Sequence, residues 1–352
     1  MGKYNYLLGV IMNLPRFNDL RAACDFCGVV PPDSLIAGQL IRTPTLSHRR
    51  SKNGYIRIFF DGAAIVGNWE NGLEAFYSDK SGKTLSRQER AELRRQSEQR
   101  RRETERELKT VREGVCQRLN VFFGADYGAY PTVSMEWQGT ARHPYLEKKH
   151  VEPTETMYEC RRENFEAYFG KDYQRLPEGR LLVFPLINTT GDLISAQFIA
   201  EDGSKYFLRN GQTKGAFWQA TFLPIDRGAP FKIHIAEGVA TLLSVLQQSE
   251  TLSGVFISCM NAGNIKPVAK AMREAYPATE IVMYADVDKP RDGRRYGVGI
   301  EKAQEAQAEV PNMKILVPPF SDSDIQRFKA ITGSDKAPTD WNDYYRIWEA
   351  RE

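Results

Sequence analysis

Four short, almost entirely apolar segments in the C-terminal half constrain the fold of this chain more than any other feature. Their sequences are FKIHIAEG, VFISCM, EIVMYAD and MKILVPP. Helix-like segments separate them, at residues 239–249, 263–276 and 298–309. Strands that alternate with helices at this spacing form a parallel sheet with helices on its faces. The sequence therefore predicts an α/β domain built on such a sheet.

Two of these apolar segments run directly into acidic residues. Glu237 follows the first, and Asp286 and Asp288 follow the third. Parallel α/β sheets bind ligands beyond the carboxyl ends of their strands, near the point where the strand order reverses. Because side chains alternate along extended chain, the two aspartates lie on one side and can reach one hard cation. An Asp-x-Asp pair alone is common, and the less favoured role for Glu237 is an acid that complements a helix macrodipole. The combination of the three acids indicates a Mg²⁺ or Mn²⁺ site with Glu237 available for proton transfer.

The first two thirds of the chain predict three further parts. Residues 17–28 form a helix that Asn18 begins and Gly28 ends. Two apolar runs joined by Asp61-Gly62 form a hairpin, and the helix and hairpin together make a small α+β unit. Residues 85–113 are dominated by Lys, Arg and Glu and form a long solvated helix. Residues 179–224 form an antiparallel meander. Its aromatic residues, Tyr206, Phe217 and Trp218, belong in the core rather than stacked on nucleic-acid bases.

Several classes of protein are disfavoured. The chain has 352 residues and a net charge of +3, so total charge says nothing about partners. The apolar stretch near the N-terminus is too short to span a bilayer, which predicts a cytoplasmic protein without membrane contact. Cys24 and Cys27 lack the second ligand pair of a zinc site, so no zinc is expected. The sequence SGKT at residues 81–84 lacks the first P-loop glycine, since position 77 is Tyr77, so no helicase motor is expected in the chain.

The stretch IHIAEGVATLLSVLQ…SCMNAGNIKPVAKAM…EIVMYADVD resembles the TOPRIM domain of bacterial DNA primases, topoisomerases and some nucleases. The likeness is strongest to the TOPRIM primases of plasmids, phages and integrative elements, and it extends to the meander, which resembles their basic subdomain, and to the terminal PTDWNDYY. It implies a Rossmann-like TOPRIM sheet, preceded by a β-rich α+β subdomain and a small N-terminal domain with a long charged helix. The predicted domains are residues 1–84, the helix 85–113, the basic subdomain 114–228, TOPRIM 229–322 and a C-terminal helical segment 323–352.

Site residues follow from the resemblance. It makes Glu237 the general acid/base and places it with Asp286 and Asp288 around the metal ion. Position 290, where some members carry a further acid, is Pro290. Asp340 and Asp343 are either an additional acidic contact or helix-capping residues. The residues expected to contact nucleotide or DNA are Lys205, Arg209, Lys214, Asn261, Gly263, Arg291, Arg294 and Arg295.

The implied activity is DNA priming, the synthesis of short oligonucleotides on a single-stranded DNA template by nucleotidyl transfer during replication of a mobile element. Nucleoside triphosphates are then the substrates, and a separate replicative helicase is the expected partner. Two other functions stay open: a TOPRIM nuclease that uses the same acids to activate water, and a non-catalytic DNA-binding replication or mobilisation factor.

Overall fold

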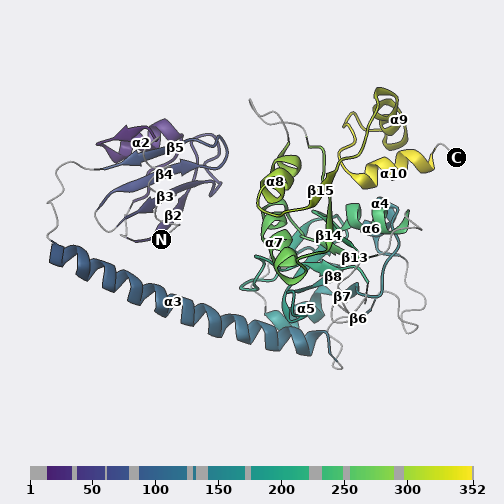
Figure 1. The fold of residues 1–352 in the computed structure, drawn as a ribbon, viewed down its shortest axis with the longest axis horizontal. Helices are drawn as coiled ribbons and strands as arrows, with labels where there is room; N and C mark the ends of the chain where they lie inside the picture. The colour runs from purple at the N-terminus through teal and green to yellow at the C-terminus, as the bar shows by residue number, and fades with distance from the viewer. Residues whose placement is uncertain are drawn as a thin grey trace. The chain divides into compact units, whose positions relative to one another are not determined.

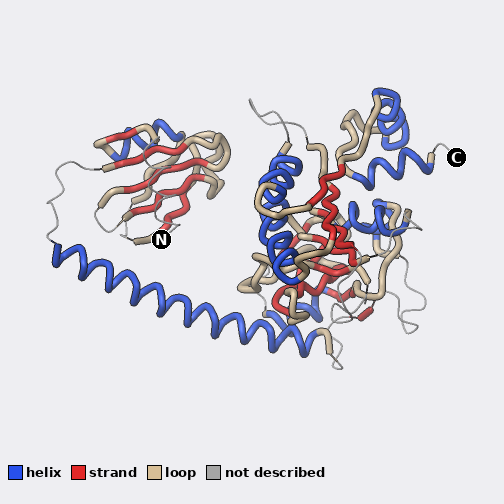
Figure 2. Tube along the Cα trace, viewed as in Figure 1, coloured by secondary structure: helices blue, strands red, loops and turns tan. Residues whose placement is uncertain are grey.

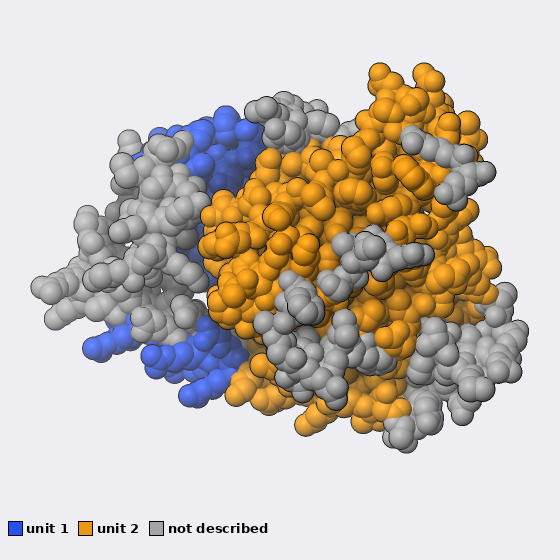
Figure 3. Space-filling view, turned by 45° about the vertical axis from the view of Figure 1, so that its right-hand side comes forward, with its two compact units in different colours: residues 1–107 blue, residues 108–352 orange. Residues whose placement is uncertain are grey.

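The computed structural model describes residues 14–33, 38–59, 62–78, 87–124, 130–131, 142–170, 176–221, 232–248, 254–288 and 297–350. The chain divides into two compact units, residues 1–107 and 108–352, which are coloured separately in Figure 3. No helix of the described residues is long and apolar enough to cross a membrane.

The first unit contains a five-stranded sheet in the order β1-β5-β4-β3-β2. The strands are β1 (Arg16–Phe17), β2 (Leu40–Thr43), β3 (Gly54–Ile58), β4 (Ala64–Asn68) and β5 (Glu74–Tyr77). The predicted hairpin is confirmed, because β3 and β4 pair in antiparallel register, although Asp61 lies outside the described residues.

Helix α2 (Leu20–Cys27) covers one face of this sheet, and its N-cap is Asp19 rather than the expected Asn18. Gly28 ends the helix at a φ of 67°, the left-handed conformation that favours glycine. Cys24 and Cys27 are buried beneath α2, where they pack with the apolar side chains of the sheet. Burial raises the pKa of both thiols, to about 12 for Cys24 and about 11 for Cys27. The two cysteines therefore serve as small apolar residues on the face of α2 that packs against the sheet.

The charged helix α3 (Arg87–Phe122) is longer than predicted. The charged pattern that predicts the helix fades at residue 113. Val115, Leu119 and Phe122 continue the helix at a spacing of four and three residues, and all three are buried in an apolar cluster. Packing of this apolar stripe accounts for the additional turns.

The second unit begins with another five-stranded sheet, in the order β10-β9-β8-β7-β6. Strands β8 (Arg180–Ile187), β9 (Leu193–Ala200) and the edge strand β10 (Lys205–Phe207) form the predicted antiparallel meander. The sequence analysis did not identify β7 (Tyr158–Arg161), which pairs with β8, or the short β6 (Tyr130–Pro131). Helices α4 (Pro144–Lys149) and α5 (Arg162–Phe169) belong to the same region.

The third sheet is the predicted parallel one, and Figures 1 and 2 show helices on both of its faces. Strands β12 (Lys232–Ala236), β13 (Val255–Ser258), β14 (Glu280–Tyr284) and β15 (Met313–Leu316) are parallel, in the order β13-β12-β14-β15. An antiparallel edge strand, β11 (Trp218–Gln219), extends the sheet beside β13. The sequence analysis had assigned this strand to the meander, but its two residues complete the parallel sheet instead.

Helices α7 (Ile265–Ala275) and α8 (Val298–Gln307) pack on one face of the parallel sheet, through the side chains of alternate strand residues such as Ile233 and Ile235. The other face packs against α6 (Val239–Gln247) and α10 (Trp341–Glu349), which follows α9 (Asp322–Thr332). The short 3-10 helix η2 (Ala262–Asn264) precedes α7.

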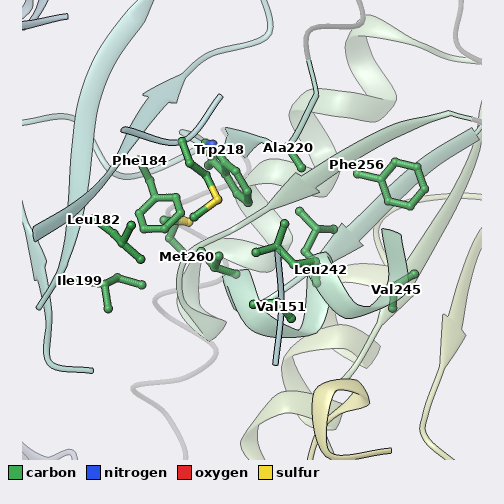
Figure 4. Close-up of a cluster of buried hydrophobic side chains, with 14 of the residues drawn as sticks. Val151, Leu182, Phe184, Ile199, Trp218, Ala220, Leu242, Val245, Phe256 and Met260 are labelled. Carbon is green, nitrogen blue, oxygen red and sulfur yellow. The ribbon is translucent and has the colours of Figure 1, made fainter. Parts of the chain in front are cut away.

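One apolar cluster joins the meander to the parallel sheet. Trp218 is fully buried and contacts Phe184 of β8 edge to face, with ring centroids 5.1 Å apart. Figure 4 shows these two rings beside Met260 and near Leu242 of α6. Each buried apolar side chain of this size stabilises the folded state by about 1.5–3 kcal/mol. The meander and the parallel sheet therefore form one packed body, which fixes β10 relative to the acidic strand ends. Trp218 and Phe217 are fully buried and Tyr206 packs on a neighbouring cluster, as expected of core residues.

Candidate active site

The acidic residues lie where the strand order of the parallel sheet reverses. Strand β12 connects through α6 to β13 on one side, whereas β14 connects through α8 to β15 on the other side. β12 and β14 are adjacent, with Ala236 opposite Tyr284. Glu237 therefore leaves the sheet beside the start of the Asp286–Asp288 segment, at the switch point where α/β sheets bind ligands.

Glu237 is held by the loop that follows β13. The backbone N–H of Ala262 donates a hydrogen bond to the Glu237 carboxylate. The Glu237 carbonyl accepts a hydrogen bond from Ser258 Oγ at 3.0 Å. Burial and the charge of Asp288 raise the pKa of Glu237, and the Lys205 ammonium and the Ala262 N–H oppose this shift. A carboxyl group with a raised pKa is suited to exchange a proton near neutral pH.

Asp286 and Asp288 are fixed by contacts from two different helices. Thr241 of α6 donates to Asp286 Oδ1 at 3.2 Å. The backbone N–H of Gly299, in the first turn of α8, donates to Asp288 Oδ2 at 3.2 Å, where the positive end of the helix dipole favours a carboxylate. Burial raises the pKa of Asp286 well above its usual range, and Asp340, Glu237 and Asp288 add to the shift.

Two glycines allow α8 to approach the acidic loop this closely. A Cβ atom on Gly297 would lie 2.2 Å from the carbonyl oxygen of Asp288. A Cβ atom on Gly299 would lie 2.7 Å from the carbonyl oxygen of Asp286. Any larger residue would therefore displace the backbone that carries both aspartates. The sequence analysis did not single out these glycines, although the sequence YGVGI shortly after the Asp-x-Asp pair was the available signal.

The C-terminal segment adds a fourth acid. Asp340 is the N-cap of α10 and accepts a hydrogen bond from the Asp343 N–H at 2.8 Å. The Val287 N–H donates to the Thr339 carbonyl at 2.6 Å, so this segment is attached to the acidic loop itself. Asp340 acts on the pKa of Asp286 and forms an ion pair with Lys149 at 3.9 Å. Asp340 therefore caps α10 and also contributes a negative charge near Asp286.

Asp343 has a capping role. It is buried and accepts a hydrogen bond from the Thr339 N–H at 2.9 Å. Burial and the neighbouring Asp340 charge raise its pKa. Its hydrogen bond orders the turn that delivers Asp340 to the acidic group.

Lys205 brings a cation to these acids from the meander. A Cβ atom on Gly238, next to Glu237, would lie 4.0 Å from Lys205 Nζ. Partial removal from water and the positive charge of Lys149 lower the pKa of Lys205, whereas Glu237, Asp286 and Asp340 act in the opposite direction. The residue is exposed, so its ammonium group is at the rim of the site, where a phosphate could reach it.

The remaining predicted contact residues differ in position. Asn261 begins η2, and Gly263 lies within it, so both belong to the loop that holds Glu237. Arg209 and Lys214 are exposed on turns between β10 and β11. Arg291, Arg294, Arg295 and Pro290 lie outside the described residues.

The acidic group fits a hard divalent cation that keeps part of its water shell. Among the described residues, no group of three or more His, Cys, Asp or Glu side chains is arranged to hold a metal ion. Magnesium does not require such a cage, because it binds one or two carboxylates together with waters and substrate phosphates. Burial raises the pKa of Asp286, and repulsion from Asp340, Glu237 and Asp288 adds to the shift; a bound cation would relieve that repulsion. Asp286 and Asp288 are the side chains that could hold such a cation.

Comparison with known proteins agrees with this geometry. The family model of the Toprim domain matches residues 232–347, and domains of this family generally bind a divalent metal ion. A DNA primase TraC from Escherichia coli is 26% identical over 293 residues, which is 82% of this chain and 18% of the relative. A second Escherichia coli DNA primase TraC is 29% identical over 145 residues, 41% of this chain and 13% of the relative. The chain thus spans less than a fifth of the length of these curated relatives.

Solved primase structures are also similar. The primase fragment of the bacteriophage T7 primase-helicase protein is 14% identical, covering 90% of this chain and 97% of that one, with a TM-score of 0.36. The DnaG catalytic core is 12% identical, covering 69% of this chain and 78% of that one, with a TM-score of 0.35. TM-scores this low do not establish a shared fold. The sequence comparisons carry the relation instead: residues 232–347 match the Toprim domain model, and the chain is distantly similar to part of the TraC DNA primases.

Proposed function

We propose that this protein is a DNA primase that joins nucleotides on a single-stranded DNA template. The observation that carries the proposal is the group formed by Glu237, Asp286, Asp288 and Asp340 with Lys205, at the switch point of a Toprim sheet in a chain related to TraC primases. Carboxylates with a nearby ammonium are the groups that phosphoryl transfer requires.

In the proposed reaction, a 3′-hydroxyl attacks the α-phosphate of a nucleoside triphosphate and pyrophosphate leaves. A divalent cation at Asp286 and Asp288, magnesium or manganese, would stabilise the charge that develops on the phosphate oxygens. Glu237 takes the proton from the attacking hydroxyl, since a raised pKa makes its carboxylate a stronger base than a solvated one. Lys205 binds a phosphate at the rim of the site and orients the triphosphate.

The protein's partners follow from the same chemistry. The template is single-stranded DNA, and a replicative helicase encoded separately supplies it. TraC relatives are named DNA primases, which favours priming over cleavage by the same acids. Arg209, Lys214, Arg291, Arg294 and Arg295 remain proposed contacts to template or nucleotide.

The domain division proposed from the sequence also stays a proposal: an N-terminal domain to residue 84, a connecting helix, a primase-like basic subdomain from 114 to 228, and the Toprim domain followed by a helical segment. Limited proteolysis with mass spectrometry of the fragments tests these boundaries.

The activity is tested with single-stranded DNA, labelled ribonucleotides or deoxyribonucleotides, and Mg²⁺ or Mn²⁺. We expect short labelled oligomers, and we expect Asp286→Ala combined with Asp288→Ala to reduce their yield by at least about 1000-fold, because the cation site is removed. Asp322→Ala is the matched control, since Asp322 is an exposed acid in the first turn of α9. Degradation of the template without synthesis would replace this proposal by a nuclease. Full synthesis by the double variant would refute the site.

A further inference from the structure

The sheet of the first unit has one face that α2 does not cover. Alternate side chains of its strands, such as Ile56 and Val66, point toward α2 and are fully buried. The residues between them point to the opposite face. That second face, together with the adjoining β2–β3 loop and Trp69, is here called the open face. Its aromatic and basic residues are Arg16, Arg42, Tyr55, Arg57, Trp69 and Phe76.

Stacked aromatic and guanidinium groups occupy the centre of the open face. Tyr55 lies directly over Gly67 of the neighbouring strand, where a Cβ atom would be 2.3 Å from the tyrosine ring. Trp69 stacks on Tyr55, with ring centroids 4.6 Å apart and planes tilted by 26°. The Arg42 guanidinium lies over the Trp69 ring, 4.8 Å from its centroid. Trp69 is nevertheless 51% exposed, which leaves much of this large ring open to a ligand.

Hydrogen bonds hold this arrangement in place before any ligand binds. Arg42 Nε donates to the Lys52 carbonyl at 3.0 Å. Tyr55 donates its hydroxyl to the Glu74 carboxylate. A second cation–π pair repeats the pattern on the same face, with the Arg16 guanidinium 5.5 Å from the centroid of Phe76. A surface already ordered in this way loses little side-chain entropy on binding.

The loop between β2 and β3 adds positive charge at the edge of the open face. Arg49, Arg50 and Lys52 are all exposed there. The loop is anchored by Glu70, whose carboxylate accepts hydrogen bonds from four side chains, Thr45, Ser47, His48 and Asn53. The acids of this region are therefore engaged internally, Glu70 by the loop and Glu74 by Tyr55, and the cations face outward.

From this geometry we infer that the open face binds a single-stranded nucleic acid. Unpaired bases stack on aromatic rings and guanidinium planes, and arginine and lysine side chains beside them bind the phosphates that connect those bases. A duplex keeps its bases stacked inside the helix, so it could use the charges but not the rings. The occupant that fits both features is a single strand of a few nucleotides, in contact with Trp69, Arg42 and the β2–β3 loop.

This binding site is separate from the proposed catalytic chemistry. It lies in the first unit, and it would hold a single strand whether the Toprim domain synthesises, cleaves or only binds nucleic acid. Its test therefore measures binding rather than synthesis.

The test uses the full-length chain and fluorescein-labelled oligo(dT), measured by fluorescence anisotropy in EDTA. Trp69→Ala should weaken binding roughly 5- to 100-fold, the range for loss of one stacked base. Arg49→Glu with Arg50→Glu leaves the sheet core intact and should lower the slope of log Kd against log salt by about 0.7 for each phosphate that the arginines no longer bind. Trp348→Ala is the matched control, because Trp348 is similarly exposed on α10, at 49%. The affinity of this variant for oligo(dT) should stay within twofold of the wild type.

Photocrosslinking with 4-thiothymidine in the same oligonucleotide locates the bound strand. We expect crosslinked peptides from residues 38–59 and 62–78. Wild-type affinity in both the Trp69 variant and the arginine double variant would overturn the inference and leave the open face to a protein partner. Crosslinks confined to residues 108–352 would overturn it as well. Asp286→Ala with Asp288→Ala should retain these crosslinks, so loss of synthesis and loss of this binding site are distinguishable.

Discussion

The contact between α8 and the acidic loop gives the sharpest test of the active site. Gly299→Ala adds a Cβ atom 2.7 Å from the Asp286 carbonyl oxygen, whereas ordinary contacts begin at 3.4 Å. Restoring an ordinary contact requires a movement of ~0.7 Å, the difference between 3.4 and 2.7 Å. Because that oxygen belongs to the residue expected to bind the cation, the carboxylate moves with it. A displacement of about 1 Å at a reacting centre costs about 100-fold, so we expect kcat/KM for primer synthesis to fall roughly 10- to 100-fold.

The stability of this variant should change much less than its activity. Overpacking costs about 1–3 kcal/mol, and replacing glycine by alanine inside a helix returns about 1 kcal/mol. Steady-state synthesis and Mn²⁺ affinity by electron paramagnetic resonance, both on the folded protein, separate the two effects. Gly114→Ala is the matched control, since a Cβ atom there meets nothing closer than 3.9 Å within α3. If Gly299→Ala kept wild-type synthesis and Mn²⁺ affinity, the inferred coupling between α8 and the acidic loop would be wrong.

Two further substitutions test charged residues of the second unit, one at the site and one on β7. Lys205→Met should raise the nucleotide KM roughly 10- to 100-fold with a smaller effect on kcat, because a charge-assisted hydrogen bond contributes about 1.5–3 kcal/mol. Lys205→Arg keeps the charge and should recover most of the nucleotide affinity. Equal impairment of both variants would exclude the proposed phosphate contact. Burial raises the pKa of Glu159 from 4.5 to about 7, so the folded state holds this proton more tightly and stability falls as the pH rises from 4.5 through 7. Glu159→Gln should therefore stabilise the protein at pH 8 by up to about 3 kcal/mol, reduced by removal of the ion pair with Arg180 at 3.6 Å, and should have little effect near pH 4.5. Urea unfolding at both pH values measures the change in the free energy of unfolding. The pKa of Glu201 is shifted in the opposite direction, so Glu201→Gln should destabilise the protein at pH 8. No difference between the two glutamate variants at pH 8 would contradict the raised pKa of Glu159.

Elements with a strong local pattern were predictable from the sequence. The four parallel strands and the helices between them were predictable because short, mostly apolar segments alternate with helix-like segments along the chain. Strand β7, with the sequence YECR, was missed because only four residues pair there and half of them are charged. Strand β11 was assigned to the wrong sheet because its two residues carry no signal of their partner.

The chemistry of the site was less accessible than its core. The acids at the ends of β12 and β14 followed from the alternation of strands and helices, whereas Asp340 could be identified only as a helix cap or a further acid. Its approach to Asp286 depends on the hydrogen bond between Val287 and Thr339, which joins residues more than fifty positions apart. Gly297 and Gly299 could not be identified from the sequence either, because their role depends on their close approach to the carbonyl groups of Asp288 and Asp286.

The charges around the site explain why so many acids can share it. Four carboxylates, from Glu237, Asp286, Asp288 and Asp340, face two ammonium groups, those of Lys205 and Lys149. If all six were ionised, the sum would be −2, the charge that one divalent cation balances. Without such a cation, Asp286 avoids part of the repulsion by holding its proton more tightly, which is the direction of its pKa shift. Because a carboxylate ligand must be deprotonated, binding of a cation at Asp286 would be coupled to release of its proton, and the cation would relieve the repulsion among the four carboxylates.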